Sequence, residues 1–298
     1  MDVNGKNFKR FFERQQLFES QYDPDSRKKQ HSKGKLTARE RIAILFDTDT
    51  FEEVDAFVTP AKGEGEFGKV TSSYGDGVII GHGQVHGRLI FAYAQDFNTM
   101  GGSLGSIHAA KIMKLQDMAL KMGAPVIGLI DSGGARIQEG VASLAGYAGI
   151  FYRNVQASGV IPQISVILGP AAGGAVYSPS ITDFVFMTNK TSYMFVTGPN
   201  VVKEVLNEEV TFDDLGGAEV HARKSGVAQM IFEDEENTLM GVRRLISYLP
   251  SNNLENCPEG ELSDDETADI EEKLRDIVPD DANKPYDVKD VINLLIDK

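Results

Sequence analysis

Apolar residues fall at two different spacings along the middle of this 298-residue chain. Residues 125–131 and 162–168 are unbroken apolar runs, which is the pattern of strands that are buried on both faces. Residues 104–122 and 139–157 instead have the 3.6-residue periodicity of helices with one apolar face. Because the two patterns alternate along the chain, they predict an α/β fold in which helices cover a buried sheet.

Shorter elements are expected on both sides of this alternation. Thr37 and Glu40 have the spacing of a capping box, which predicts a helix that runs to about Phe46. Residues 78–96 have the pattern of a β-hairpin that turns near His86. The other expected elements are helices at 7–22, 173–179, 198–207 and 235–248, and strands at 51–58, 183–187 and 226–232.

Polar and acidic residues dominate the end of the chain. Beyond Leu249 the sequence is rich in turn residues, which marks a boundary or a linker. We therefore expect one domain over residues 1–257 and a second, acidic segment over 258–298. Residues 255–298 hold 15 acidic and 5 basic residues, and the net charge of the whole chain is -14. This balance argues against nucleic acid as a partner.

Composition also limits the cellular context. No apolar run approaches the roughly 20 residues that are needed to cross a bilayer, and the N-terminus has no apolar core of a signal peptide. We therefore expect a cytoplasmic protein without a membrane span. The single cysteine, Cys257, cannot form an internal disulfide and has no histidine nearby in sequence, so it is interpreted as a bystander.

Several familiar motifs are incomplete here. The segment GHGQVHG at 81–87 lacks the GxGxxG spacing, and no GxxxxGK[ST] loop occurs, which disfavours dinucleotide and Walker-type sites. His82 and His86 are four residues apart, but Gly83 stands where HExxH requires glutamate, so a zinc site is also disfavoured. Ser132 has neither a GxSxG elbow nor a histidine nearby, and we interpret it as a turn residue.

Three glycine-rich turns are the strongest candidates for chemistry. They are the first glycine turn (97–105, FNTMGGSLG), the second (131–140, DSGGARIQEG) and the third (169–179, GPAAGGAVYSP). Each lies between a predicted strand and a predicted helix, where glycine lets backbone N–H groups approach an anion and a helix start adds its positive dipole end. Turns after consecutive strands open on one side of such a sheet and can face one ligand. The alternative is that the glycines only permit tight packing.

Charged residues near these turns each have two interpretations. The basic segment at 27–42, RKKQHSKGKLTARERI, is suited to a polyanion such as the phosphates of a nucleotide-containing substrate, but it is equally the pattern of a solvated face. Arg136 and Glu139 either contact substrate or form an ion pair that anchors the second glycine turn. We favour the anchoring interpretation.

Longer motifs add a family resemblance. They are GKLTARERI (34–42), YGDGVIIGHG (74–83), DSGGARIQEGVASL (131–144), SGVIPQISVILGPAAGGAVYSP (158–179), TGPNVVKEV, LGGAEVH and SYLPSNNLE. Together they resemble the N-terminal half of the carboxyltransferase β subunit of biotin-dependent acyl-CoA carboxylases, with propionyl-CoA carboxylase as the nearest type. Biotin-dependent methylmalonyl-CoA decarboxylases share this subunit design. The resemblance spans essentially the whole chain and implies a crotonase-like fold, a spiral of ββα units.

The resemblance also implies a mechanism without an acid–base pair from the protein. In that family carboxybiotin releases carbon dioxide, the biotin ureido nitrogen takes the α-proton of an acyl-CoA, and the enolate captures the carbon dioxide. The cofactor is itself the base. The protein stabilises the enolate and ureido oxyanions with fixed backbone N–H groups. The implied substrate is a CoA thioester, and the implied partners are a biotin carboxyl carrier protein and a biotin carboxylase subunit. No metal is implied.

The same resemblance assigns roles to the glycine turns. The backbone N–H groups of Gly173 and Gly174 form the favoured oxyanion hole. The second choice is the turn at Gly133, Gly134 and Ala135. The acyl-CoA channel is lined by Gly101, Gly102 and Ser103. On charge alone, the residues expected to contact the CoA phosphates are Lys33, Lys35 and Arg39.

One departure from the family concerns length. Family members continue into a second, similar half, and their active sites form between the N-half of one subunit and the C-half of another. Residues 276–298 resemble the connector and first helix of that second half, so we expect the chain to be a truncated or split subunit that needs a C-terminal half in an oligomer. The alternatives are a decarboxylase subunit, which runs the same transfer in reverse, and a non-catalytic acyl-CoA-binding fragment.

Overall fold

A computed structural model describes residues 5–20, 24–60, 64–65, 68–70, 73–259, 267–281 and 283–296. The chain forms two compact units, Met1–Cys257 and Pro258–Lys298. Within the described ranges, no helix combines the length and the apolar character that a bilayer crossing requires.

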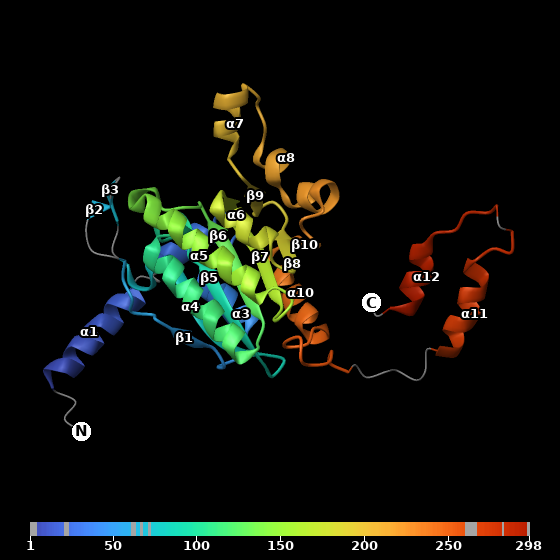
Figure 1. Cartoon of the computed structure of the whole chain (residues 1–298), viewed down its shortest axis with the longest axis horizontal. Helices are drawn as coiled ribbons and strands as arrows, with labels where there is room; N and C mark the ends of the chain where they lie inside the picture. The colour runs from blue at the N-terminus through green and yellow to red at the C-terminus, as the bar shows by residue number, and fades with distance from the viewer. Residues whose placement is uncertain are drawn as a thin grey trace. The chain divides into compact units, whose positions relative to one another are not determined.

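An eight-stranded mixed sheet forms the centre of the first unit (Figure 1). Its order is β1-β4-β5-β6-β7-β8-β10, and β9 pairs with β7. The first three strands of this order are antiparallel, whereas the pairs from β5 onward are parallel. The strands are β1 Glu52–Val54, β4 Val78–Val85, β5 Arg88–Gln95, β6 Val126–Ser132, β7 Gln163–Ala172, β8 Phe184–Thr188, β9 Tyr193–Phe195 and β10 Met230–Phe232; the separate pair is β2 Glu64–Gly65 and β3 Gly68–Lys69.

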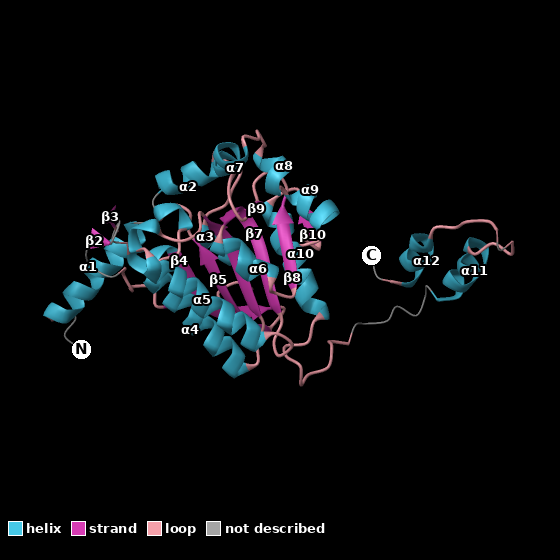
Figure 2. Cartoon of the chain, turned by 45° about the horizontal axis from the view of Figure 1, so that its top comes forward, coloured by secondary structure: helices cyan, strands magenta, loops and turns pink. Residues whose placement is uncertain are grey.

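Helices cover both faces of the sheet (Figure 2), with α4, α5 and α6 on one face and α3 and α10 on the other. The helices are α1 Lys6–Ser20, α2 Pro24–His31, α3 Ala38–Leu45, α4 Ser106–Met122, α5 Val141–Ala157, α6 Gly174–Ser180, α7 Pro199–Leu206, α8 Phe212–Gly216, α9 Ala218–Val220 and α10 Glu235–Tyr248. Short helical turns are η1 Tyr74–Gly77, η2 Met100–Gly102, η3 Ile137–Glu139 and η4 His221–Ser225. The second unit holds α11 Thr267–Ile277 and α12 Val288–Leu295, which contact each other.

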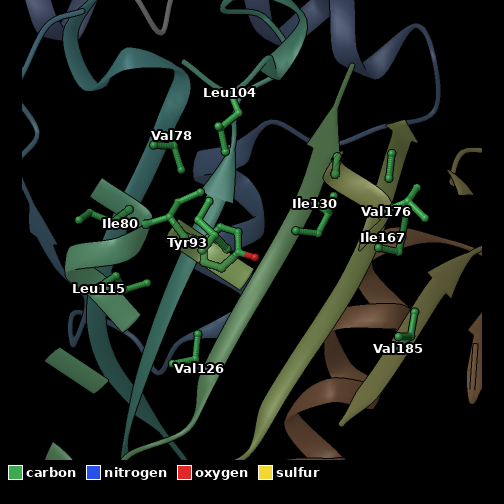
Figure 3. Packing of buried hydrophobic residues seen from close by; sticks show 14 of the residues in the cluster. Val78, Ile80, Tyr93, Leu104, Leu115, Val126, Ile130, Ile167, Val176 and Val185 are labelled. Carbon is green, nitrogen blue, oxygen red and sulfur yellow. The ribbon is translucent and has the colours of Figure 1, made fainter. Parts of the chain in front are cut away.

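The central strands are buried on both faces, as their unbroken apolar runs predict. In β6, Val126 and Ile130 pack toward α4 and α5 (Figure 3), whereas Ile127 and Leu129 pack toward α3 and α10. All four side chains are buried. A strand that is covered by helices on both faces has no position for a solvent-facing polar residue.

Most of the expected local elements are confirmed. The Thr37 hydroxyl accepts a hydrogen bond from the Glu40 N–H, and the Glu40 carboxylate accepts one from the Thr37 N–H, which completes the capping box. The hairpin of β4 and β5 turns at His86 and Gly87. No pattern in the sequence predicted α2, which overlaps the start of the basic segment.

Some boundaries differ from the expectation. The strand expected at 51–58 ends at Val54, because Asp55 has a positive φ of 56° that breaks the extended backbone. The strand expected at 226–232 begins only at Met230, since Gly226 has left-handed geometry. Of the helix expected at 7–22, residues 21 and 22 lie outside the described residues.

Candidate functional site

Backbone hydrogen bonds join the first and second glycine turns side by side. The Gly133 N–H donates to the Gly101 carbonyl at 2.9 Å, and the Leu104 N–H donates to the Gly134 carbonyl, also at 2.9 Å. The Ser132 hydroxyl donates to the Gly102 carbonyl at 2.7 Å. These bonds explain the role of Ser132 as a turn residue. They also show that turns far apart in sequence meet at one end of the parallel strands.

The third glycine turn lies against the second. A Cβ atom placed on Gly134 would stand 2.8 Å from the Ala172 carbonyl oxygen, closer than a side chain tolerates. Gly134 also has a φ of +99°, which favours glycine on conformational grounds. The three turns predicted to converge therefore do converge.

Backbone donors in these turns differ in whether they have an acceptor. The Gly173 N–H donates to the Phe195 carbonyl at 3.2 Å, where β9 lies beside the end of β7. The Gly134 N–H donates to the Ser132 hydroxyl at 3.2 Å. In the described part of the chain no acceptor is found for the N–H groups of Gly174 and Ala175, which open α6, or for that of Ala135; the N–H groups of Gly101 and Gly105 in the first turn also have none.

This pattern shifts the candidate oxyanion donors by one residue. Gly174 has a free N–H, as expected of a donor, and so has Ala175, whereas the N–H of Gly173 donates to the Phe195 carbonyl. In the second turn, Ala135 has the free donor, whereas those of Gly133 and Gly134 are engaged. Free N–H groups at a helix start lie at the positive end of the helix dipole, which suits a small anion.

Gly173 also has a backbone geometry that sets it apart. Its φ of 57° and ψ of -124° lie in a region that is essentially restricted to glycine. Gly140, which precedes α5, has nearly the same geometry, with φ 54° and ψ -130°. Each glycine turns the chain sharply into the helix that follows.

Tyr147 of α5 lies directly beneath Gly174. A Cβ atom on Gly174 would stand 2.6 Å from the Tyr147 ring, so the backbone of α6 packs on the face of that ring. The Tyr147 hydroxyl is buried, and the Ser132 hydroxyl lies near it without a hydrogen bond of ordinary geometry. Burial raises the pKa of this hydroxyl above its usual value. Any side chain at Gly174 would therefore displace the Tyr147 ring as well as block the space beside the N–H groups.

Lys35 is not available to CoA, which corrects its assignment as a phosphate contact. Its side chain is only 6% exposed, and its ammonium group lies 2.7 and 2.6 Å from the two carboxylate oxygens of Asp131. Burial lowers its pKa, and the Asp131 carboxylate opposes that shift. Lys35 is thus part of the protein interior.

The Lys35–Asp131 pair belongs to a buried cluster of four charges with Arg41 and Glu235. The Arg41 guanidinium donates to both carboxylate oxygens of Glu235 at 2.7 Å, to Asp131 at 2.9 Å and to the Leu168 carbonyl at 3.2 Å. Two positive and two negative groups balance one another, which is the condition for burying charge. We call these four residues the charge cluster. Asp131 and Leu168 end the apolar runs of β6 and β7, so the cluster lies below the second and third turns.

The other two predicted phosphate contacts differ from each other. Arg39 donates to Glu53 at 2.9 Å and lies 4.9 Å from the Phe18 ring centroid, so its charge is already engaged. Lys33 is exposed, and its ammonium lies 5.4 Å from the centroid of Phe97. In the described ranges it forms no ion pair, which leaves Lys33 as the one of the three residues with a charge open to a ligand.

Arg136 and Glu139 form the ion pair that the favoured interpretation predicted, at 2.8 Å. The Arg136 side chain is fully buried and Glu139 is nearly so. The further partners of Arg136 were not predictable from the sequence, because they come from turns more than 30 residues away.

Comparisons with known proteins establish the family of this chain. The family model described as the carboxyl transferase domain matches residues 29–298, so the chain belongs to that family. Methylmalonyl-CoA decarboxylase subunit alpha of Veillonella parvula is 54% identical over 270 residues, which cover 90% of this chain and 52% of that protein. The propionyl-CoA carboxylase beta chain of Cereibacter sphaeroides is 55% identical over 270 residues, with the same coverage. The chain thus spans about half the length of the curated relatives it matches.

Solved structures show the same fold. Transcarboxylase 12S, whose crystal structure is a hexamer with hydrolysed methylmalonyl-coenzyme A bound, aligns with a TM-score of 0.90 and 45% identity over 97% of this chain and 56% of that one. The geranyl-CoA carboxylase beta subunit of P. aeruginosa aligns with a TM-score of 0.70 and 27% identity over 98% of this chain and 55% of that one. The predicted family and the crotonase-like α/β fold are confirmed.

Proposed function

We propose that this chain is the acyl-CoA-binding half of a biotin-dependent acyl-CoA carboxyltransferase of the propionyl-CoA carboxylase β type. The observation that carries the proposal is the free pair of N–H groups on Gly174 and Ala175, held beside the joined first and second turns. Family membership gives these donors a substrate class. The reaction is transfer of a carboxyl group from carboxybiotin to the α-carbon of a short acyl-CoA.

The residues of this chain stabilise the oxyanions that form in that reaction. Carboxybiotin, held on a separate carrier protein, supplies the carbon dioxide and the proton acceptor. The N–H groups of Gly174 and Ala175 stabilise a developing oxyanion, and that of Ala135 serves as a further donor in the neighbouring turn. Such fixed donors lower the barrier because they need no reorganisation, and losing one costs about 10²–10³ in rate. The orphan donors fit a thioester enolate or a ureido oxygen equally well.

The CoA moiety is placed by the first turn and by Lys33. Gly101, Gly102 and Ser103 lie beside the second turn and line the acyl-CoA channel in this proposal. A Cβ on Gly102 would stand 2.1 Å from the Asp131 carbonyl oxygen, so this glycine is required for the close approach of the two turns. The exposed ammonium of Lys33 is available to a CoA phosphate.

A C-terminal carboxyltransferase half is the proposed partner that completes the site. In this proposal residues 1–257 are the N-terminal carboxyltransferase domain and 258–298 lead into that second half. Exposed apolar side chains on α5 support a partner surface, because Val141 is 71% exposed, Leu144 60% and Val155 62%. A biotin carboxyl carrier protein and a biotin carboxylase subunit complete the oligomeric enzyme. The cytoplasmic location stays a prediction.

A second candidate is the α subunit of a methylmalonyl-CoA decarboxylase. The 54% identity to such a subunit from Veillonella parvula favours it, since the same site serves both directions of transfer. A non-catalytic acyl-CoA-binding fragment is the remaining alternative.

Calorimetric titration with propionyl-CoA and with free CoA tests the binding part of the proposal. We expect both to bind and propionyl-CoA to bind more tightly, because only the thioester oxygen reaches the free N–H groups. Equal affinity for the two ligands would remove the glycine turns from the acyl site. Absence of binding by either ligand would overturn the proposal.

A further inference from the structure

A buried arginine joins the first and second glycine turns from within the protein. The Arg136 guanidinium donates through Nη1 to Asp76 at 2.7 Å and to Glu139 at 2.8 Å, and through Nη2 to the Ser103 carbonyl at 2.9 Å. Its side chain is fully buried. Ser103 belongs to the first turn and Arg136 itself to the second, so this one side chain spans both.

Each carboxylate partner of Arg136 is bound to a further element. The second oxygen of Asp76 accepts a hydrogen bond from the His108 N–H of α4 at 2.8 Å. The second oxygen of Glu139 accepts from the Ser106 N–H and from the Ser106 hydroxyl, both at 2.7 Å, at the start of α4. The guanidinium is therefore held in place by η1, η3 and the first turn of α4.

The backbone of the first turn packs tightly against this group. A Cβ atom on Gly105 would stand 2.5 Å from Arg136 Nη1 and 2.1 Å from the Glu139 carboxylate. The guanidinium–carboxylate pair thus lies directly against the main chain of the first turn. Such a contact transmits the position of one turn to the other.

We propose that Arg136 is a positioning residue, which sets the distance between the first and second glycine turns and so aims the Ala135 N–H at the thioester oxygen. Ala135 is bonded into the same arrangement, since the N–H of its neighbour Arg136 donates to the Leu104 carbonyl at 2.9 Å. The inference rests on the proposed function. Arginine is required because a planar fork bonds acceptors in two directions, whereas a lysine ammonium is a single point charge.

The test uses Arg136→Lys and Glu139→Gln in the full chain. Glutamine at 139 keeps the size of the side chain but cannot accept on both sides, so it loses either the Arg136 or the Ser106 bonds. Arg153→Lys is the matched control, because Arg153 forms an ion pair with Asp117 at 2.7 Å on the surface of α5 and does not contact the turns. The readout is the infrared carbonyl band of bound [1-¹³C]propionyl-CoA, together with the affinities for propionyl-CoA and free CoA.

We expect the wild-type chain and Arg153→Lys to shift the carbonyl band to lower frequency by the same amount. Arg136→Lys should reduce the shift and weaken propionyl-CoA binding about tenfold relative to free CoA, the effect of one misplaced hydrogen bond to a polar group. Glu139→Gln should also reduce the band shift and weaken propionyl-CoA binding, but by a smaller amount. A full band shift in folded Arg136→Lys overturns the positioning role alone. If that variant does not fold, a full shift in Glu139→Gln overturns it. No band shift in the wild-type chain overturns the proposed function and this inference with it.

Discussion

Replacement of Lys35 by methionine separates the two roles that the sequence allowed for this residue. If Lys35 contacted a CoA phosphate, its replacement would weaken CoA binding and leave stability unchanged. If Lys35 belongs to the charge cluster, its replacement would instead lower the stability of the fold, because both oxygens of Asp131 lie within 2.7 Å of its ammonium. Methionine keeps an unbranched apolar side chain of similar length, so the change removes mainly the charge and its hydrogen bonds.

The size of the effect follows from the remaining partners. Breaking a buried ion pair by removing one member costs about 3–5 kcal/mol, because the other charge stays buried without compensation. Here Arg41 still donates to Asp131 at 2.9 Å, which compensates part of that charge. The cluster keeps one positive and two negative groups, however. We therefore expect a loss at the low end of the range, about 3 kcal/mol in the free energy of unfolding.

Urea unfolding followed by far-ultraviolet circular dichroism measures this loss, since the chain has no tryptophan. Lys33→Met is the control, because Lys33 is exposed and forms no ion pair within the described ranges. We expect Lys33→Met to leave the unfolding midpoint unchanged and to weaken CoA binding. Lys35→Met should lower the unfolding midpoint and leave CoA binding unchanged. A Lys35→Met chain that is as stable as the wild type would refute the reasoning from burial.

Three further predictions concern single positions. Gly133→Ala should leave stability nearly unchanged, because its Cβ would lie 3.6 Å from the Gly101 oxygen and its φ is ordinary; in calorimetry the added methyl should weaken propionyl-CoA binding, and unchanged affinity would place the ligand elsewhere. Gly173→Ala should cost about 1–3 kcal/mol from backbone strain alone, since its Cβ contacts nothing closer than 3.9 Å, and an unchanged melting temperature would contradict this. Burial lowers the pKa of Lys111 to about 8, so the unfolded chain binds more protons between pH 8 and the unfolded value. Wild-type stability relative to Lys111→Met should therefore rise with pH from 8 to 10, by at most about 1.4 kcal/mol per pH unit, and a flat difference in urea unfolding would contradict the lowered pKa.

Sequence patterns predicted the framework because the spacing of apolar and polar residues is a local property of the chain. The unbroken run of β6 required cover on both faces, and Ile127 and Leu129 on one side with Val126 and Ile130 on the other provide it. The capping box at Thr37 was predictable for the same reason, since its partners are three residues apart.

The use of individual donors and charges was not predictable in this way. The Gly173 N–H donates to the Phe195 carbonyl because β9 pairs with β7, and no pattern in the sequence predicted β9. Lys35 stands in a basic segment, but its partner Asp131 lies 96 residues away. Sequence shows that a charge or a donor exists, whereas only the fold shows what already occupies it.

The most direct test of the central claim is carboxyl transfer from free carboxybiotin to propionyl-CoA, measured with the chain alone and with a C-terminal half from a propionyl-CoA carboxylase beta chain added. We expect no transfer by either part alone and transfer when both are present, because the free N–H groups of Gly174 and Ala175 supply only part of the oxyanion stabilisation. Absence of transfer in the complemented assembly, while propionyl-CoA still binds, would contradict the account and leave the chain as an acyl-CoA-binding module.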